Sequence, residues 1–285
     1  MFSFFLVIMV LGDDCMPELP EVETVKNTLK RQILNKKILL SNIYWSNIIA
    51  YPEVPVFKEK IKNQRINDIL RRGKWLMFEL DDYFLLSHLR MEGKYFIRKK
   101  GDQLNKHEHI VFLFDDDTEL RYHDTRKFGK MYLLEKNNAY DVKPLNELGL
   151  EPWDERLDVT YLKNKFNKKP IKIQLLDQSI ISGIGNIYAD EILFLSKIYP
   201  EVSGNKLSDE NLKDIIKYTR EVLSSAIKLG GTTVKSYTSS EGVHGRFQEE
   251  LLVHTKKICP SCGNDIIKIV VGGRGTYFCP KCQKR

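Results

Sequence analysis

The sequence predicts an α+β protein built from three consecutive parts. Residues 37–135 hold a series of short segments rich in β-branched and aromatic residues and separated by turn signals, a pattern typical of a β-sandwich. After residue 156 the apolar residues recur with helical spacing, which indicates a second, helical domain. Near the end, two Cys-x-x-Cys pairs are separated by 16 residues, the spacing of a four-cysteine zinc ribbon. We therefore predict a β-sandwich over residues 16–136, a helical domain over 150–235 and a ribbon within 236–285.

Residues 1–15 differ in character from the domains that follow. Their apolar run, residues 4–11, is shorter than the roughly 20 residues of a membrane span, and no basic residue precedes it as in a secretory signal. We interpret the segment as a start codon placed too far upstream, with translation beginning at Met16; a targeting segment is the alternative. Without it the net charge rises from +7 to +9, because Asp13 and Asp14 are lost. Either value favours a polyanionic partner.

A helix is predicted directly behind Met16 and Pro17. Pro20 suits a first helical turn, Glu21 suits the positive end of the helix dipole, and apolar residues then recur at helical spacing. The apolar positions are Val22, Val25, Leu29 and Ile33. The sandwich domain therefore begins with an amphipathic helix whose positive end lies beside Pro17.

Pro17 becomes a candidate nucleophile if Met16 is removed. Its free secondary amine would titrate near a pKa of roughly 8, so that part of it is unprotonated at neutral pH. Such an amine can add to a sugar aldehyde carbon and form a cationic iminium, which divides one difficult displacement into two easier steps. Glu18 is the neighbouring proton carrier. While Met16 is attached, the nitrogen belongs to an amide and cannot attack.

Several further motifs carry polar or glycine residues between the predicted elements. A basic turn contains Lys74, two loops contain Met91 and Phe128, and the run Gly183-Ile184-Gly185-Asn186 can cradle an anion ahead of a helix. By themselves these patterns also fit a solvated turn, core side chains and an ordinary helix start. His107 and His109 are two residues apart and could form a metal pair, but no third ligand is obvious. Surface histidines without a metal are the alternative.

The cysteine pairs at the end of the chain indicate one structural zinc ion. Their members, Cys259, Cys262, Cys279 and Cys282, would fill all four positions of a tetrahedral site and leave none for a catalytic water. Disulfides are the alternative, which the otherwise cytosolic character of the chain disfavours. The hairpin between the pairs carries Arg274 at its turn.

The run MPELPEVET, the turn RRGKWL, the segment GIGNIYADE and the zinc ribbon together resemble the formamidopyrimidine-DNA glycosylases. The resemblance covers residues 16–285. It implies that the helical domain is a helix-two-turn-helix unit. It also implies a base-excision-repair DNA glycosylase and AP lyase that removes oxidised purines, such as 8-oxoguanine and formamidopyrimidines. Such an enzyme works through a Schiff base at the N-terminal proline and cuts the strand by β,δ-elimination.

The resemblance also assigns roles to individual residues. It implies catalytic roles for Pro17, Glu18, Lys74 and Arg274, and DNA contacts by Met91, His107, Arg126, Phe128, Lys172 and Asn186. The segment 230–248 would be a mobile loop over an everted base. The partner would be double-stranded DNA that contains oxidised bases or abasic sites. The protein would act as a monomer in the cytoplasm, associated with the nucleoid.

The chain departs from the family pattern in several places. Thr125 and Lys127 stand where proline and arginine are usual, which bears on the rigidity of that loop, and Asn167 aligns with a lysine that contacts phosphate. The sister family for oxidised pyrimidines carries glycine where Leu19 stands, so we favour the purine enzyme. A zinc-ribbon DNA-binding protein without catalysis is the remaining alternative, and it applies if Pro17 is never freed.

Overall fold

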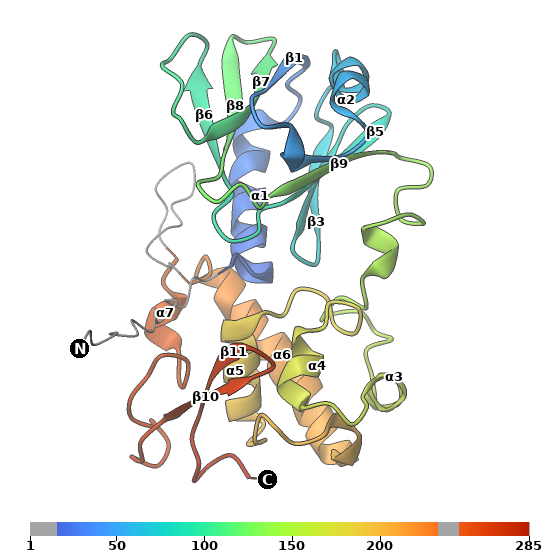
Figure 1. The fold of residues 1–285 in the computed structure, drawn as a ribbon. Helices are drawn as coiled ribbons and strands as arrows, with labels where there is room; N and C mark the ends of the chain where they lie inside the picture. The colour runs from blue at the N-terminus through green and yellow to red at the C-terminus, as the bar shows by residue number, and fades with distance from the viewer. Residues whose placement is uncertain (1–15, 233–244, 285) are drawn as a thin grey trace, which may run out of the picture.

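Two β-sheets form the upper half of the molecule in the computed structural model, which describes residues 16–232 and 245–284 (Figure 1). The four-stranded sheet has the order β1 (Ile38–Ile43), β7 (Glu108–Phe114), β8 (Thr118–His123) and β6 (Lys94–Lys99), all antiparallel. The five-stranded sheet has the order β2 (Ile49–Tyr51), β9 (Lys130–Glu135), β5 (Tyr83–His88), β4 (Trp75–Glu79) and β3 (Asp68–Arg72), and only β2 and β9 are parallel. The predicted sandwich is confirmed.

The sandwich core lies between the two sheets. Strand β7 is buried along its whole length, and Phe78, Phe112 and Tyr122 are among the largest fully buried side chains. Sequence reasoning missed β2, of three residues, and helix α2 (Val54–Ile61), which adds Phe57 and Ile61 to this core. Both elements are too short to show a clear period.

The lower half contains the helices α3 (Val159–Lys165), α4 (Ile171–Leu176), α5 (Asn186–Leu195) and α6 (Asp209–Lys228), as the apolar spacing predicts. Asp158 caps α3 by accepting a hydrogen bond from the Tyr161 backbone N–H at 2.7 Å. Two further short elements, the 3-10 helices η2 (Leu145–Glu147) and η3 (Gly204–Lys206), lie in the connections, and α7 (Phe247–Glu250) follows the undescribed residues 233–244. In the part of the chain that the structure describes, no helix has the length and apolar character needed to cross a membrane.

The C-terminal hairpin consists of β10 (Ile267–Val271) and β11 (Arg274–Phe278). Its turn residues Gly272 and Gly273 have φ of +58° and +77°, which favour glycine. A Cβ at Gly272 would lie 2.6 Å from Ile173 Cδ1, so the turn packs closely against α4. The ribbon is thus held against the helical domain.

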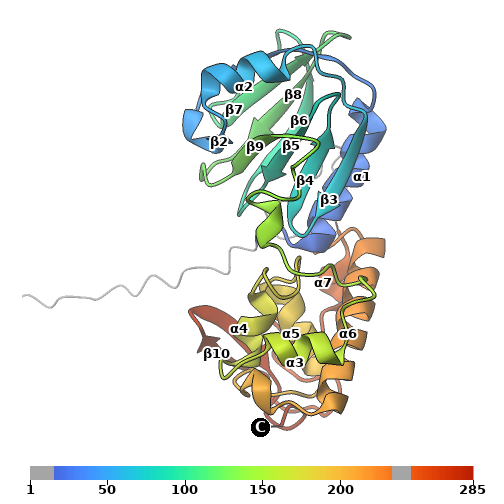
Figure 2. The same ribbon diagram turned by 90° about the vertical axis from the view of Figure 1, so that its right-hand side faces the viewer.

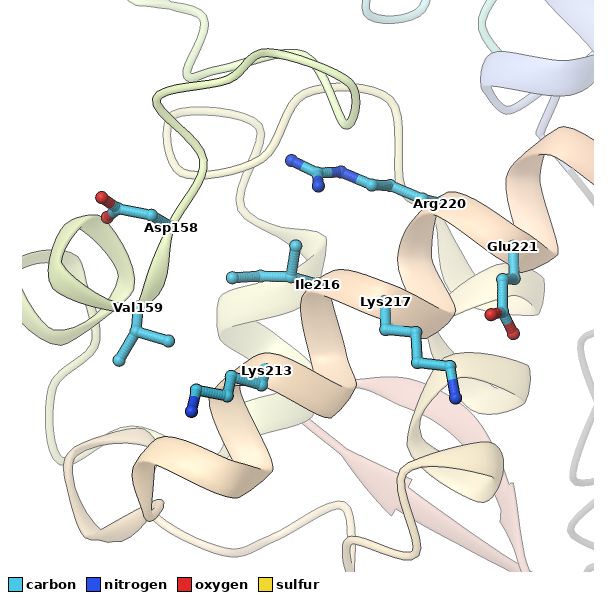
Figure 3. A pocket seen from close by; sticks show the side chains of 7 residues that line it. All are labelled: Asp158, Val159, Lys213, Ile216, Lys217, Arg220 and Glu221. Atoms are coloured by element: carbon cyan, nitrogen blue, oxygen red, sulfur yellow. The ribbon is translucent and has the colours of Figure 1, made fainter.

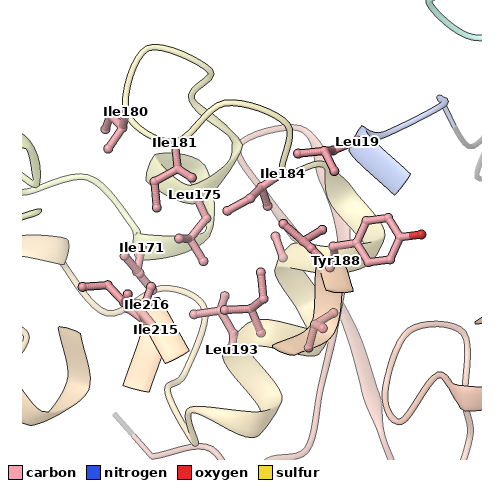
Figure 4. Packing of buried hydrophobic residues seen from close by; sticks show 14 of the residues in the cluster. Leu19, Ile171, Leu175, Ile180, Ile181, Ile184, Tyr188, Leu193, Ile215 and Ile216 are labelled. Carbon is pink, nitrogen blue, oxygen red and sulfur yellow. The ribbon is translucent and has the colours of Figure 1, made fainter. Parts of the chain in front are cut away.

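Helix α1 (Leu19–Ile33) joins the two halves (Figure 2). Val22, Val25, Leu29 and Ile33 belong to the sandwich core, whereas Leu19 packs into the core of the helical domain (Figure 4). A Cβ at Gly183 would lie 2.4 Å from Leu19 Cδ1, so this contact is tight. The first turn of α1, with Pro17 and Glu18 before it, therefore lies at the junction of the two domains.

Candidate active site

Glu18 is the centre of the candidate site. Its side chain is buried, and its Oε1 accepts a hydrogen bond from the backbone N–H of Ile187 at 2.9 Å, in the first turn of α5. Among the described residues, its Oε2 has no hydrogen-bond partner. A Cβ at Gly185 would lie 2.2 Å from Glu18 Cδ, so glycine at that position makes room for this carboxyl. One carboxyl oxygen is fixed and the other is available for chemistry.

The Glu18 carboxyl holds its proton more tightly than an ordinary glutamate. Burial raises its pKa from 4.5 to about 7, because the buried site penalises the charged form. The positive charges of Lys74 and Lys172 oppose this shift, and the charge of Glu21 adds to it. At neutral pH the carboxyl therefore exists in both protonation states, as a residue that gives and takes a proton requires.

Glu21 fixes the backbone next to Pro17. The peptide N–H that joins Pro17 to Glu18 donates to Glu21 Oε2 at 3.0 Å. The other oxygen of Glu21 accepts from the Tyr188 hydroxyl at 2.6 Å and from the backbone N–H of Thr232 at 2.8 Å. Glu21 thus connects the segment that contains Pro17 to α5 and to Thr232, the last residue described before residues 233–244.

Lys74 lies on the turn between β3 and β4 and is buried, which excludes the interpretation of this turn as a solvated surface. The carboxylate of Glu151, in the interdomain linker, accepts from the backbone N–H of Gly73 at 2.6 Å and from Arg71 Nη2 at 2.9 Å. Arg72 Nη1 donates to the same carboxylate at 3.1 Å. The linker therefore fixes the turn that carries Lys74.

The side chain of Lys172, from α4, reaches Asn186 at the start of α5. Lys172 is completely buried, and its Nζ lies 2.5 Å from Asp190 Oδ1 and 2.8 Å from the carbonyl oxygen of Asn186. The Asn186 side-chain amide donates to the carbonyl oxygen of Gly275 at 2.9 Å. Because Gly275 follows the exposed Arg274, this bond sets where the hairpin meets the helical domain.

A second group of predicted residues lies on the sandwich. Phe128 is 50% exposed, so the alternative of a core side chain is wrong for it, and the Arg126 guanidinium lies 5.2 Å from its ring centroid. The half-buried Met91 is on a neighbouring loop. A Cβ at Gly93 or at Gly129 would lie 2.3 Å or 1.7 Å from the Tyr122 hydroxyl, so both loops pack closely against this side chain.

The loop that carries Arg126 and Phe128 is held without a proline at Thr125. Asp124 is buried, and it accepts from the backbone N–H groups of Arg126 at 3.0 Å and Gly129 at 2.8 Å. The Lys127 ammonium lies 3.8 Å from the ring centroid of Trp45. These contacts hold the loop in place, although the family's usual proline is absent at Thr125.

His107 is half-buried and joins this second group through its backbone. Its carbonyl oxygen accepts from the Asp124 N–H at 3.0 Å, and its ring lies 5.5 Å from that of His123. Among the described residues, the cysteine cluster is the only group of three or more metal-ligating side chains that is close enough to hold an ion, and His107 and His109 belong to no such group.

The four cysteines fit one zinc ion. Their Sγ atoms all lie within 4.8 Å of one another, with 3.5 Å between Cys262 and Cys279 and 3.8 Å between Cys259 and Cys282. A tetrahedron with Zn–S bonds of about 2.3 Å places its sulfurs about 3.8 Å apart. These separations are too long for disulfides, which require about 2.05 Å. The four thiolates therefore form the site of a single structural zinc.

Removing one zinc ligand should weaken DNA binding and leave the sandwich domain folded. In Cys279→Ser the ion is expected to be lost, and the hairpin that carries Arg274 should lose its fixed position, because metal binding supplies much of the folding energy of such a ribbon. Zinc content by atomic absorption and DNA affinity by fluorescence anisotropy check this result. A variant without zinc that binds DNA as tightly as the unmodified protein would contradict it.

Sequence reasoning missed several residues that shape the site. Glu21 stands three residues after Glu18, the spacing of a capping box, so this signal was available. Asp190 stands in the GIGNIYADE segment without having been singled out, and Glu151 and His254 showed no local pattern. Asp190 and His254 are 64 residues apart in sequence, although their side chains lie 2.7 Å apart.

A hollow on the outer face of α6 is separate from the site (Figure 3). It has a volume of about 520 Å³ and contains none of the predicted site residues. Its lining comes from α6 and the start of α3: Asp158, Val159, Lys213, Ile216, Lys217, Arg220 and Glu221.

Comparison with known proteins matches three consecutive parts of the chain to family models. The model of the formamidopyrimidine-DNA glycosylase N-terminal domain matches residues 16–131, and the model of the H2TH domain of that glycosylase matches 148–238. The model of the zinc finger found in FPG and IleRS matches residues 257–285. These matches extend over most of the described chain.

Named relatives and solved structures are similar over nearly the full length. The formamidopyrimidine-DNA glycosylase of Oceanobacillus iheyensis is 47% identical over 273 residues, which cover 94% of this chain and 98% of that protein. That of Bacillus subtilis is 46% identical over 275 residues, 95% of this chain and 100% of that protein. The Lactococcus lactis Fpg in complex with DNA containing an abasic site has a TM-score of 0.88 and 38% identity, and the alignment covers 94% of this chain and 100% of that one.

The sandwich, the helical domain and the zinc ribbon define a DNA glycosylase with a structural zinc. This chain belongs to the formamidopyrimidine-DNA glycosylase family.

Proposed function

We propose that this protein removes oxidised purines from double-stranded DNA and then cuts the strand at the abasic site, with Pro17 as nucleophile and Glu18 as proton donor. The family is one of base-excision DNA glycosylases with AP lyase activity. The observation that carries the proposal is the Glu18 carboxyl. It is buried next to Pro17, has one oxygen fixed and the other unpartnered among the described residues, and has a pKa of about 7.

The reaction begins with attack of the unprotonated Pro17 nitrogen on C1′ of the deoxyribose. The glycosidic bond breaks and the base leaves with its electron pair, and the Pro17 nitrogen then loses its own proton, which neutralises the departing base and restores the nitrogen lone pair. Glu18 gives its proton to the ring oxygen, the bond between that oxygen and C1′ breaks, and a cationic iminium joins Pro17 to the sugar. This cation acidifies the C2′ hydrogen. Loss of that proton expels the 3′ phosphate, and a second elimination expels the 5′ phosphate.

The other predicted residues hold the DNA in this scheme. Met91, Arg126 and Phe128 enter the duplex where the damaged nucleotide swings out, because apolar wedges unstack a step for a few kcal/mol. His107, Lys172 and Asn186 hold the strand around the lesion, and Lys74 contacts the adjacent phosphate and assists proton transfer. Arg274 stabilises the leaving phosphate as an electrostatic clamp, since its guanidinium cannot readily give up a proton.

The loop proposed to cover the everted base falls mostly on residues 233–244, which lie outside the described residues. Glu21 accepts from Thr232 just before this segment, and a Cβ at Gly231 would lie 2.5 Å from Glu21 Oε1. Thr232 is thus fixed to the first turn of α1. Because the named relatives are bacterial, we place the activity in the bacterial cytoplasm, associated with the nucleoid.

A panel of duplex oligonucleotides tests the proposal. The chain beginning at Pro17 is incubated with duplexes that carry 8-oxoguanine, a formamidopyrimidine, thymine glycol or no lesion, and strand cleavage is followed on denaturing gels. The two oxidised purines should be cut much faster than thymine glycol, and the undamaged duplex should stay intact. Cleavage of thymine glycol alone would overturn the assignment in favour of the sister specificity.

A further inference from the structure

A continuous chain of buried hydrogen bonds leads from the zinc-binding part of the molecule to Glu18. His254 Nδ1 lies 2.7 Å from Asp190 Oδ2, and Asp190 Oδ1 lies 2.5 Å from Lys172 Nζ. Lys172 Nζ also donates to the carbonyl oxygen of Asn186 at 2.8 Å. The N–H of the same peptide unit, at Ile187, donates to Glu18 Oε1 at 2.9 Å. Lys172 and Glu18 therefore bind opposite ends of one peptide group.

Asp190 is held rigidly in this chain. Its side chain is completely buried, and the backbone N–H of Tyr277, on β11, also donates to Oδ2 at 3.2 Å. The backbone of His254 is fixed by Glu191, whose Oε1 accepts from the His254 N–H at 2.8 Å. The His254 ring also packs against Tyr277, with 4.9 Å between their centroids.

Lys172 has several anionic neighbours, but it forms its ion pair with Asp190. It is fully buried and interacts electrostatically with Asp190, Glu18 and Glu191. Its ammonium bonds to Asp190, whereas the Oε2 of Glu18 has no hydrogen-bond partner among the described residues. An ammonium paired directly with Glu18 would favour the ionised carboxylate and remove the proton that the reaction needs.

We propose that Asp190 is a positioning residue that acts as the counter-ion of Lys172, keeps the ammonium from pairing with Glu18, and so leaves Glu18 able to carry its proton. His254 orients Asp190 from the zinc-binding side of the molecule. The inference rests on the proposed function, because it concerns Glu18 as the proton donor. Base removal then depends on Asp190 and His254, which act on Glu18 through Lys172 and need not touch the DNA.

The charges around Glu18 set the direction in which its pKa should move. Lys74 on the β3–β4 turn, Lys172 on α4 and Glu21 on α1 interact with Glu18 electrostatically. Asp190 and Glu191, on α5, interact in turn with Lys172. Replacing Asp190 by asparagine removes one negative charge and frees Lys172 to bond to Glu18. Glu18 then loses its proton at lower pH.

The test is the pH profile of base removal, measured in single turnover on an 8-oxoguanine duplex with full-length protein beginning at Pro17. In Asp190→Asn the alkaline limb of the profile is expected to move to lower pH by about one unit, because an opposite charge next to a carboxylate lowers its pKa by that order. His254→Phe, which keeps an aromatic ring against Tyr277 but lacks the donor, should give a smaller shift of the same sign. His254→Asn, whose amide can replace Nδ1, should restore the original profile.

Borohydride trapping on DNA that already contains an abasic site separates this inference from the proposed function. Trapping needs Pro17 but no base removal, so the three variants should trap as strongly as the unmodified protein and bind one zinc ion. If the unmodified protein fails to trap, the proposed function fails. If it traps and the alkaline limb of Asp190→Asn coincides with its own, or moves to higher pH, the role of Asp190 is overturned.

Discussion

Replacing Pro17 by glycine is expected to abolish the borohydride-stable complex with abasic-site DNA. The ring nitrogen of proline is a secondary amine, so its adduct with the sugar is an iminium that stays positively charged at every pH. Glycine gives a neutral imine that must first gain a proton, and it also frees the backbone that Glu21 holds in place. The measurement is the amount of trapped protein on a denaturing gel.

Two companion proteins make this result interpretable. Pro55→Gly, at an exposed position in the first turn of α2, should trap at full strength, since it changes a proline away from the site. A form that keeps Met16 attached should trap nothing, because its proline nitrogen belongs to an amide. Full-strength trapping by Pro17→Gly would refute the assignment of the nucleophile.

Glu18→Gln is expected to remove base excision while leaving lyase activity on a preformed abasic site. General acid catalysis contributes roughly 10²- to 10⁴-fold, so the single-turnover rate on an 8-oxoguanine duplex should fall by about that factor. The pKa of Glu18 is raised to about 7, so its proton is present below pH 7 and is lost as the pH rises through that value. The alkaline limb of base removal by the unmodified enzyme should therefore follow the ionisation of Glu18, while deprotonation of Pro17 sets the acidic limb, and the residual rate of the variant should lack the alkaline decline.

Measuring Glu18→Gln on both the 8-oxoguanine duplex and abasic-site DNA distinguishes a missing acid from a folding defect. The variant should still bind its zinc and still trap abasic-site DNA, because neither requires a proton from Glu18. Equal loss on both substrates would point to a misplaced Pro17 and not to a missing acid. An unchanged rate on the 8-oxoguanine duplex would show that another group delivers the proton.

The fold followed from the sequence wherever the signal was local. The helix behind Pro17 was predicted from apolar residues one turn apart, and the same residues enter the sandwich core. The four cysteines were predicted from their spacing alone, and their sulfurs converge within 4.8 Å. Helix α2 was missed because its 8 residues bury only Phe57 and Ile61, too few to establish a period.

The site was predictable in its parts but not in its connections. Glu18, Lys74, Lys172 and Asn186 were named through the family resemblance, yet nothing in that resemblance showed that Lys172 is buried against Asp190. Long-range partners such as Glu151 with the Lys74 turn depend on how the two domains pack. A pattern of a few neighbouring residues does not contain that information.

The position of α1 across two hydrophobic cores has a consequence for the order in which the enzyme matures. Leu19 and Glu18 depend on Gly183, Gly185 and Ile187, which the ribosome makes more than a hundred and fifty residues later. N-terminal domains generally fold first during synthesis. A nascent chain whose sandwich has already formed therefore still lacks the peptide group that holds the Glu18 carboxyl. Pro17 is among the first residues made, but the carboxyl beside it gains its hydrogen-bond partner only when the helical domain packs against α1.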